Sequence, residues 1–231
     1  MIKEKIVKRY GKGILGASTV ALLAAAAFGS GAAQAHSPEP KGGDKTVTLS
    51  ATLTELNGSG ASGTATAEVR NQKIKHIEVH ASGLTPDAPH AQHIHFGDQA
   101  RHECPTLAGD DANGDGHVNT VEGIPAYGPV AVSLTTTGDT SPASVVDVAR
   151  FPVSQAGSYD YSRDNIRITK VEGTGKAKDI ADAIRKGEGV VVIHGLDYNG
   201  DGEYDFNHGA SELNPDLPAE ATDPAACGVL Q

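Results

Sequence analysis

Eight stretches of the chain are rich in Val, Ile and Thr, and all but the uniformly apolar residues 190–193 alternate apolar or β-branched residues with polar ones. This period of two constrains the fold more than any other feature. Such alternation is typical of half-buried β-strands, because successive side chains point to opposite faces of a sheet. The stretches span residues 46–56, 63–70, 73–81, 90–96, 130–137, 144–150, 166–171 and 190–194. Gly and Asp turns separate them, so we predict an all-β fold, a Greek-key β-barrel or sandwich of about eight antiparallel strands with long loops. One short helix is expected over residues 177–186, where Ile180, Ala181 and Ile184 share a helical face.

The first 35 residues have the organisation of a secretory signal peptide. A segment rich in Lys and Arg precedes an apolar stretch over residues 14–29, and Ala-Gln-Ala at residues 33–35 fits a cleavage site. An uncleaved anchor is the alternative, but the apolar stretch is shorter than the roughly 20 residues that a spanning helix needs. We therefore expect a secreted or extracytoplasmic protein of the cell envelope. The expected parts are a signal peptide over 1–35, a flexible linker over 36–45 and the β-domain over 46–231.

The charge of the chain excludes polyanionic partners. Among 231 residues, 29 are acidic and 19 basic, for a formal net charge of −10. Cleavage after residue 35 removes five basic residues and one acidic residue, which leaves 14 basic and 28 acidic residues and a net charge of −14. Such a charge opposes nucleic acid and anionic lipid and favours hard cations. We expect no nucleic acid partner and, once the signal is cleaved, no membrane.

Several of the ten histidines gather at strand positions that suit a metal. In the stretch from His90 to Asp98, His93 and His95 are two residues apart and so project from the same face of a strand, whereas His90 does not. His194 ends a strongly apolar run, and a histidine at the end of a buried strand usually has a partner or a ligand. Imidazole pairs suit copper or zinc, with solvent-facing histidines as the alternative.

Residues 111–122, the first acidic loop, match a calcium loop of the EF-hand type. Oxygen-bearing side chains stand at positions 1, 3, 5 and 9, Gly stands at position 6, and Glu stands at position 12 for bidentate coordination. The predicted ligands are Asp111, Asn113, Asp115, the backbone carbonyl of His117, Asn119 and Glu122. No clear flanking helices are expected, so we predict an isolated calcium loop, with an acidic turn that holds no ion as the alternative.

Residues 197–208, the second acidic loop, repeat this pattern incompletely. Its candidate calcium ligands are Asp197, Asn199, Asp201 and Asp205. Position 12 is His208, so calcium here would be bound without the glutamate. A competing role is support of the nearby metal-binding histidines, because metal-bound imidazoles commonly donate their second N–H to a carboxylate.

The chain has two cysteines, Cys104 and Cys227. An even number of cysteines in an exported chain predicts a disulfide, here one that ties the C-terminus to the middle of the domain. Two free buried thiols are the alternative.

Together these segments resemble the copper/zinc superoxide dismutases. Gly83-Leu84-Thr85 followed by the His90–Asp98 stretch resembles that family's first copper-ligand strand, and residues 191–194 resemble its late copper-ligand strand. The C-terminal Ala-Cys-Gly-Val at residues 226–229 is similar to that of the family, and Cys104 falls where the family's disulfide partner lies. The resemblance spans about residues 46–231. It implies His93, His95 and His194 as copper ligands with His117 or His102 as the candidate fourth, His90 as a structural histidine, and a bridge from Cys104 to Cys227.

Two departures from the family bear on its chemistry. The family carries a histidine that bridges copper and zinc six residues after the first cysteine, where this chain has Asp110, and residues 105–124 contain a single histidine, His117. Zinc is therefore not expected. The family also has an active-site arginine three residues before the last cysteine, where this chain has Pro224. Without that cation near the metal, dismutation would be slow or absent.

Two functions follow, and the sequence leaves both open. The first is a secreted copper-binding, superoxide dismutase-like protein whose copper alternates between Cu(II) and Cu(I) and converts superoxide, its small-molecule substrate, to O2 and peroxide. The second is a non-catalytic secreted module that binds copper or calcium, such as a chordin-like β-sandwich. No catalytic residue is assigned, and a homodimer is left open.

Overall fold

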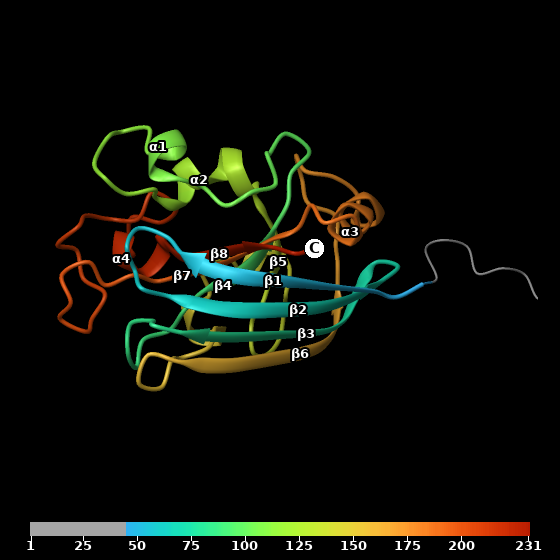
Figure 1. Ribbon diagram of the computed structural model, residues 1–231, viewed down its shortest axis with the longest axis horizontal. Coiled ribbons are helices and arrows are strands. Elements are labelled where there is room, and N and C mark those ends of the chain that lie inside the picture. The colour runs from blue at the N-terminus through green and yellow to red at the C-terminus, as the bar shows by residue number, and fades with distance from the viewer. Residues whose placement is uncertain (1–44) are drawn as a thin grey trace, which may run out of the picture. The chain divides into compact units, whose positions relative to one another are not determined.

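The computed structural model describes residues 45–231, and the predicted signal peptide and nearly all of the linker lie outside them (Figure 1). The strands form one curled sheet in which every pairing is antiparallel, in the order β5-β4-β7-β8-β1-β2-β3-β6. They span Val47–Glu55 (β1), Ser62–Arg70 (β2), Lys73–Ser82 (β3), Gln92–His95 (β4), Val130–Ser133 (β5), Tyr159–Arg167 (β6), Val190–His194 (β7) and Pro224–Val229 (β8). The expected all-β architecture of eight antiparallel strands is confirmed.

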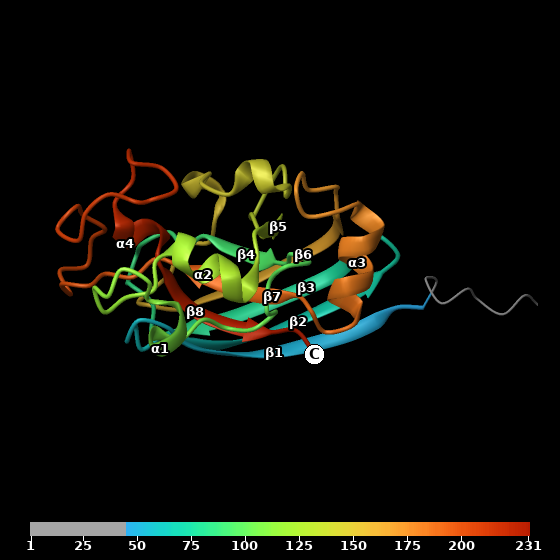
Figure 2. The same cartoon turned by 90° about the horizontal axis from the view of Figure 1, so that it is seen from above.

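The sheet has two halves that meet along β1 and β8. Strands β1, β2, β3 and β6 pair over most of their length, and β5, β4, β7 and β8 form shorter pairings among themselves, with register shifts between β4 and β5 and between β7 and β8. Between the halves, β1 and β8 pair only at Thr54 with Cys227 and at Glu55 with Ala226. The curl places the β4–β7–β8 side over the β1–β2–β3 side, with the hydrophobic core between them (Figure 2).

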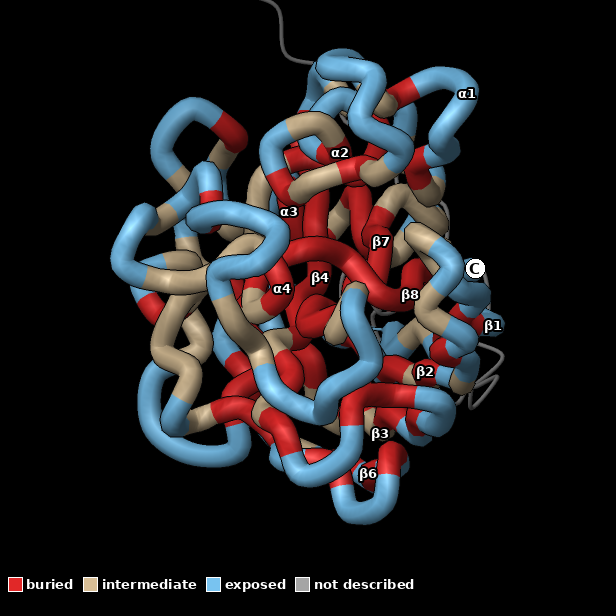
Figure 3. Tube along the Cα trace, turned by 90° about the vertical axis from the view of Figure 1, so that its left-hand side faces the viewer, coloured by how far each residue is buried: buried red, intermediate tan, exposed pale blue. Residues whose placement is uncertain are grey.

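The burial pattern explains why some strands alternate and β7 does not. On β1, Leu49, Ala51 and Leu53 are buried and their neighbours are more exposed, because one face of that half meets solvent. All five residues of β7 are buried. Its other face packs under Tyr127 in a second, smaller hydrophobic cluster. Figure 3 shows the buried strands β4, β7 and β8 behind a border of exposed loops.

Two of the strand predictions need correction, and one strand was not predicted. Residues 144–150 form no strand; short 3-10 helices span Pro142–Ser144 and Val148–Arg150, the first capped by the Ser141 side chain. The strand predicted over 166–171 lies earlier, as the edge strand β6, in which Tyr159 and Tyr161 are buried but the alternation is interrupted between Arg163 and Asn165. Strand β8 was not predicted, because its short, small side chains carry no period of two.

The predicted helix is confirmed as α3 (Ala177–Arg185), with Ile180, Ala181 and Ile184 buried. The expectation of a single helix was wrong. Residues 45–231 contain three more: α1 (Leu107–Asp110), α2 (Thr120–Tyr127) and α4 (Ala219–Thr222). None of the helices in residues 45–231 is long and apolar enough to cross a membrane.

Helices α1 and α2 flank the first acidic loop, so the prediction that no helices flank it was also wrong. One turn, α1, ends at Asp110, directly before the loop, and α2 begins within it. The signal for α2 is a capping box, in which the Asn119 side chain accepts from backbone N–H groups of the first turn and the Glu122 side chain reaches back to the N–H of Asn119. The residues chosen as calcium ligands therefore also start a helix.

The predicted disulfide is confirmed. Cys104 and Cys227 are joined, with 5.7 Å between their Cα atoms and 123 residues between them in the sequence. The bond ties the segment ahead of α1 to β8. A loop of this length corresponds to about 5 kcal/mol of stabilisation in the chain-entropy model.

Candidate metal centre

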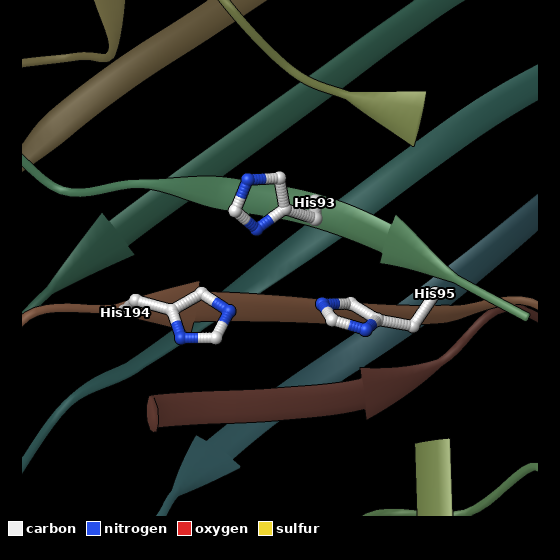
Figure 4. A group of neighbouring side chains, drawn as sticks. All are labelled: His93, His95 and His194. Atoms are coloured by element: carbon white, nitrogen blue, oxygen red, sulfur yellow. The ribbon is translucent and has the colours of Figure 1, made fainter. Parts of the chain in front are cut away.

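Three buried histidines from two adjacent strands form the candidate centre, and we call His93, His95 and His194 the histidine trio. Their potential ligand nitrogens all lie within 4.8 Å of one another. The ring centroids are 5.6 Å apart for His93 and His95, 5.2 Å for His93 and His194, and 5.8 Å for His95 and His194. Figure 4 shows the rings from β4 and β7 gathered around a common space. Among the described residues, no other three His, Cys, Asp or Glu side chains come this close together.

The local structure explains this convergence. His93 and His95 share one face of β4, as the sequence predicts, and β7 is the neighbouring antiparallel strand. The pairing of β7 with β8 shifts between Ile193 and His194, which changes the register at the end of β7, where His194 lies. The side chains of the trio are almost completely buried, with exposed fractions of 2% for His93, 1% for His95 and 3% for His194.

Backbone carbonyls set the tautomers of two of the rings. The Nδ1–H of His95 donates to the carbonyl oxygen of Gly128 (2.8 Å), and the Nδ1–H of His194 donates to that of Thr222 (2.6 Å). A carbonyl only accepts, so each Nδ1 carries the proton and each Nε2 keeps its lone pair. Both Nε2 atoms and both ring nitrogens of His93 are buried without a hydrogen-bond partner. Buried polar atoms are rarely left unpaired, and these have the chemistry of metal ligands.

Burial also keeps the three rings neutral. It is the main cause that lowers the pKa of His95 to about 3 and that of His194 to about 4. Burial, together with the neighbouring imidazoles, lowers the pKa of His93 well below its ordinary value. A neutral imidazole is the form that binds a metal, so no proton has to leave before binding at physiological pH.

The hydrogen bonds of the trio correct one prediction about the second acidic loop. The sequence offers a carboxylate of this loop, such as Asp197 or Asp201, as the partner of a metal-bound imidazole. The Nδ1–H groups of His95 and His194 donate to backbone carbonyls instead. The carboxylate of Asp197 accepts from the N–H groups of Gly200 and Gly202 in its own loop.

The other candidate histidines lie outside the trio. His90 is fully buried, with Nδ1 3.0 Å from the carbonyl oxygen of His194 and Nε2 3.1 Å from that of Thr85. His102 stacks on Phe96 and lies 2.9 Å from the carbonyl oxygen of Gly97. His117 packs against Tyr198, with 4.3 Å between ring centroids. Neither His102 nor His117 joins the trio within 4.8 Å.

A cavity of about 270 Å³ opens onto the trio. Its other lining side chains are almost all apolar, and Thr120 and Thr222 are the exceptions. No Lys, Arg, Asp or Glu among the described residues lines it. Ile124 and Leu213, which are 37% and 40% exposed, are among the most exposed residues that line it.

The two acidic loops fold alike. Each loop begins with an aspartate, Asp111 or Asp197, whose carboxylate accepts hydrogen bonds from the backbone N–H groups three and five residues later. These distances are 2.7 and 2.9 Å in the first loop, and both are 2.7 Å in the second. The next ligand candidate, Asn113 or Asn199, accepts from the N–H two residues on, at 2.8 or 2.9 Å. Among the described residues, no three carboxylates of these loops converge as the nitrogens of the trio do.

Sequence reasoning missed Glu220. In the first loop, Glu122 accepts from the N–H groups of positions 2 and 9, both at 3.1 Å. In the second loop, position 12 is His208, which has no carboxylate. Glu220 of α4 makes the equivalent contacts instead, because its carboxylate accepts from the N–H of Tyr198 at position 2 (3.0 Å) and from that of Asp205 at position 9 (2.8 Å). Glu220 is fully buried. The carboxylate missing from the motif is supplied from a separate segment, and no local spacing signals it.

Comparison with known proteins adds no family assignment. No protein-family model matches the chain, and no curated protein sequence matches it. Among solved structures, the chain is similar to superoxide dismutase 5 (SOD5) of Candida albicans with Cu(II), at 18% identity over 68% of this chain and 86% of that chain, with a TM-score of 0.35. It is also similar to a glutamate-to-glutamine mutant of that protein, at 14% identity over 80% of this chain and 91% of that chain, again with a TM-score of 0.35.

Proposed function

We propose that this protein is an exported copper protein that holds one copper ion through His93, His95 and His194. The observation that carries the proposal is the convergence of three neutral, buried imidazoles with unpartnered nitrogens within 4.8 Å. Imidazole suits copper, which is also the divalent first-row metal that such ligands bind most tightly. The order of the matching segments along the chain resembles that of the copper/zinc superoxide dismutases and favours the same metal.

The chain's own residues prepare the site for the ion. Gly128 and Thr222 hold the protons of His95 and His194 on Nδ1, so that both Nε2 atoms stay free. The apolar cavity limits the access of water and of charged competitors. Bound copper would supply one-electron chemistry between Cu(II) and Cu(I).

Superoxide dismutation is the activity that the family resemblance implies. Two superoxide ions and two protons would yield O2 and hydrogen peroxide. The second candidate is a non-catalytic copper holder, and one observation favours it: the described lining of the cavity carries no cation to attract and orient an anion. We therefore propose copper binding as the function and expect superoxide turnover to be slow.

We also propose that both acidic loops bind calcium. In the first, the ligands are those of the motif, Asp111 to Glu122. In the second, the ligands would be Asp197, Asn199, Asp201 and Asp205, with Glu220 in place of the missing glutamate. The equivalent hydrogen bonds of Glu122 and Glu220 support this assignment.

Export to an oxidising compartment completes the proposal. The disulfide between Cys104 and Cys227 is typical of proteins that mature outside the reducing cytosol. The N-terminal 35 residues have the composition of a signal peptide.

Copper binding is tested by metal analysis of protein purified without metal and then reconstituted. We expect one copper per chain, nitrogen hyperfine structure in the electron paramagnetic resonance spectrum, and loss of both in a His93→Gln/His95→Gln variant. The matched control is His80→Gln, a change at an exposed strand histidine outside the trio. Unchanged copper affinity in the double variant would refute the site. Superoxide decay is measured on the same sample, and a rate equal to that of buffer would leave the non-catalytic function.

A further inference from the structure

Thr120 lies where the supports of two rings of the histidine trio meet. It is the first residue of α2 and is 6% exposed. Its hydroxyl donates to the carbonyl oxygen of Thr222 (2.5 Å), the same oxygen that accepts the Nδ1–H of His194 (2.6 Å). Its own carbonyl oxygen accepts from the hydroxyl of Tyr127 (2.7 Å). Tyr127 is fully buried and packs on His95, with 4.4 Å between the ring centroids.

Capping of α2 does not explain a threonine at this position. Asn119 is the N-cap residue, and its side chain accepts from the N–H groups of Val121 and Glu122. The Thr120 side chain instead lines the cavity that opens onto the trio, among mostly apolar residues. A hydroxyl in such surroundings is costly unless it is paired, and its hydrogen bond reaches across to α4. The role left to this side chain is the contact with Thr222.

The hydroxyl completes the hydrogen bonding of the Thr222 carbonyl. Thr222 ends the four-residue helix α4, so its carbonyl has no partner within the helix. A carbonyl oxygen has two lone pairs, and this oxygen accepts one hydrogen bond from Thr120 and one from His194. The carbonyl is thereby held from two sides, and the plane of the His194 ring is fixed with it. Without the hydroxyl, the carbonyl would be held only by the ring that it has to orient.

The third ring of the trio is independent of Thr120. Both ring nitrogens of His93 are without a hydrogen-bond partner, and the ring packs edge to face on Phe151, with 5.2 Å between the centroids. Thr120 therefore acts on His95 and His194 alone. Replacing a group that orients a metal ligand commonly weakens the binding of the metal.

We propose that Thr120 is a positioning residue for the copper site. Its hydroxyl fixes the ring of His194 through the carbonyl of Thr222, and its carbonyl holds Tyr127 against His95. The inference rests on the proposed function, because the orientation of these rings matters only where they bind copper. The hydrogen bonds themselves are measurable in the metal-free protein.

The test compares Thr120→Val, which keeps the shape of the side chain and removes the hydroxyl, with Thr120→Ser, which retains the hydroxyl. In NMR spectra of the metal-free protein, we expect the Nδ1–H proton of His194 to shift and to exchange with water faster in Thr120→Val. After reconstitution, copper affinity in a competition titration should fall about fivefold, the equivalent of one neutral hydrogen bond. The g values in the electron paramagnetic resonance spectrum should change as well. Thr120→Ser should resemble the unmodified protein in all three measurements.

Ser154→Ala is the matched control. The buried hydroxyl of Ser154 donates to the carbonyl oxygen of Thr85 (2.6 Å), which lies 3.1 Å from Nε2 of His90, a histidine outside the trio. This variant loses the same kind of hydrogen bond, and it should leave copper affinity and the paramagnetic resonance spectrum unchanged. Circular dichroism checks that each variant is folded.

Tyr127→Phe tests the second contact without a change at Thr120, and it should shift the ring signals of His95 more than those of His194. Ring signals of His95 that do not shift in this variant would contradict the inference. So would a copper affinity and spectrum that Thr120→Val leaves unchanged, or a change that Thr120→Ser shares. The unmodified protein decides the proposed function separately. Its failure to bind copper overturns that function, whereas copper binding that is equal in Thr120→Val overturns only the role of Thr120.

Discussion

The backbone carbonyl oxygen of Thr222 accepts a hydrogen bond from the Nδ1–H of His194 at 2.6 Å. The same oxygen accepts from the hydroxyl of Thr120, at the start of α2 (2.5 Å). Thr222 lies in α4, two residues after Glu220, which closes the second acidic loop. Gly128, whose carbonyl orients His95, is the C-cap residue of α2. Helix α2 carries Glu122, which closes the first acidic loop. The helices that close the two acidic loops therefore carry the carbonyls that orient two of the three proposed copper ligands.

This arrangement predicts that calcium strengthens copper binding. Calcium would hold α2 and α4 in place, and with them the carbonyls that orient His95 and His194. We expect copper affinity to fall roughly fivefold or more when calcium is removed by dialysis, since coupling between two sites is typically 1–3 kcal/mol. A competition titration for copper, with and without calcium, measures this effect.

A matched pair of variants locates that coupling. Glu220→Gln should reduce the effect of calcium on copper affinity. Glu203→Gln, in the same loop but at a position that offers calcium only its backbone carbonyl, should preserve it. Circular dichroism checks that both variants are folded. Equal calcium effects in the two variants would show that Glu220 does not link the sites.

The first acidic loop gives a separate prediction through Glu122. Glu122→Gln keeps the capping box of α2, since Gln also fits that position, but removes the bidentate carboxylate. We expect calcium affinity to fall at least about tenfold, and calcium to raise the melting temperature less than in the unmodified protein. Calorimetric titration and thermal melts with and without calcium are the measurements. Unaltered calcium binding in both would exclude this loop as a site.

The disulfide predicts a large stability loss on reduction. Replacing Cys104 and Cys227 together by Ser should lower the free energy of unfolding by about 2–5 kcal/mol, because the unfolded chain gains the freedom of a long loop. Urea unfolding measures the difference. The unmodified protein in reductant should match the variant, and the variant itself should not respond to reductant.

The buried trio predicts that the metal-free protein is destabilised by acid. Burial depresses the pKa of His95 to about 3 and of His194 to about 4, whereas an unfolded histidine titrates near 6.5. The unfolded state therefore binds more protons as the pH falls below about 6.5, and stability that is fully present above that pH is lost toward about pH 4. Each histidine contributes a slope of up to about 1.4 kcal/mol per pH unit.

Urea unfolding of the metal-free protein from neutral pH down to about pH 4 measures this slope. His194→Gln should make it shallower, because Gln does not titrate. The exposed His80→Gln should change the slope much less than His194→Gln does. A slope that does not depend on His194 would contradict the burial argument.

The sequence predicted those features that depend on local periodicity. The alternation along β1, β2 and β3 and the apolar run of β7 identified these strands because each pattern repeats within one strand. The spacing of His93 and His95 placed both rings on one face for the same reason. Local patterns failed where the alternation is interrupted, as in β6, and where a strand is made of small residues, as in β8. They also failed where Pro142 and the Ser141 cap start a 3-10 turn instead of a strand.

By itself, the sequence determined the strand-rich class, the pairing of two histidines on one strand, the turn geometry of the two acidic loops and the presence of one cysteine pair. Only the tertiary structure decided that β7 lies beside β4 and so brings His194 to His93 and His95. It also decided that Glu220 closes a loop that begins at Asp197, and that an apolar cavity without charged side chains covers the trio. The physical reason is that local patterns report the conformation of single segments, whereas a site is made by contacts between segments that are far apart in the chain.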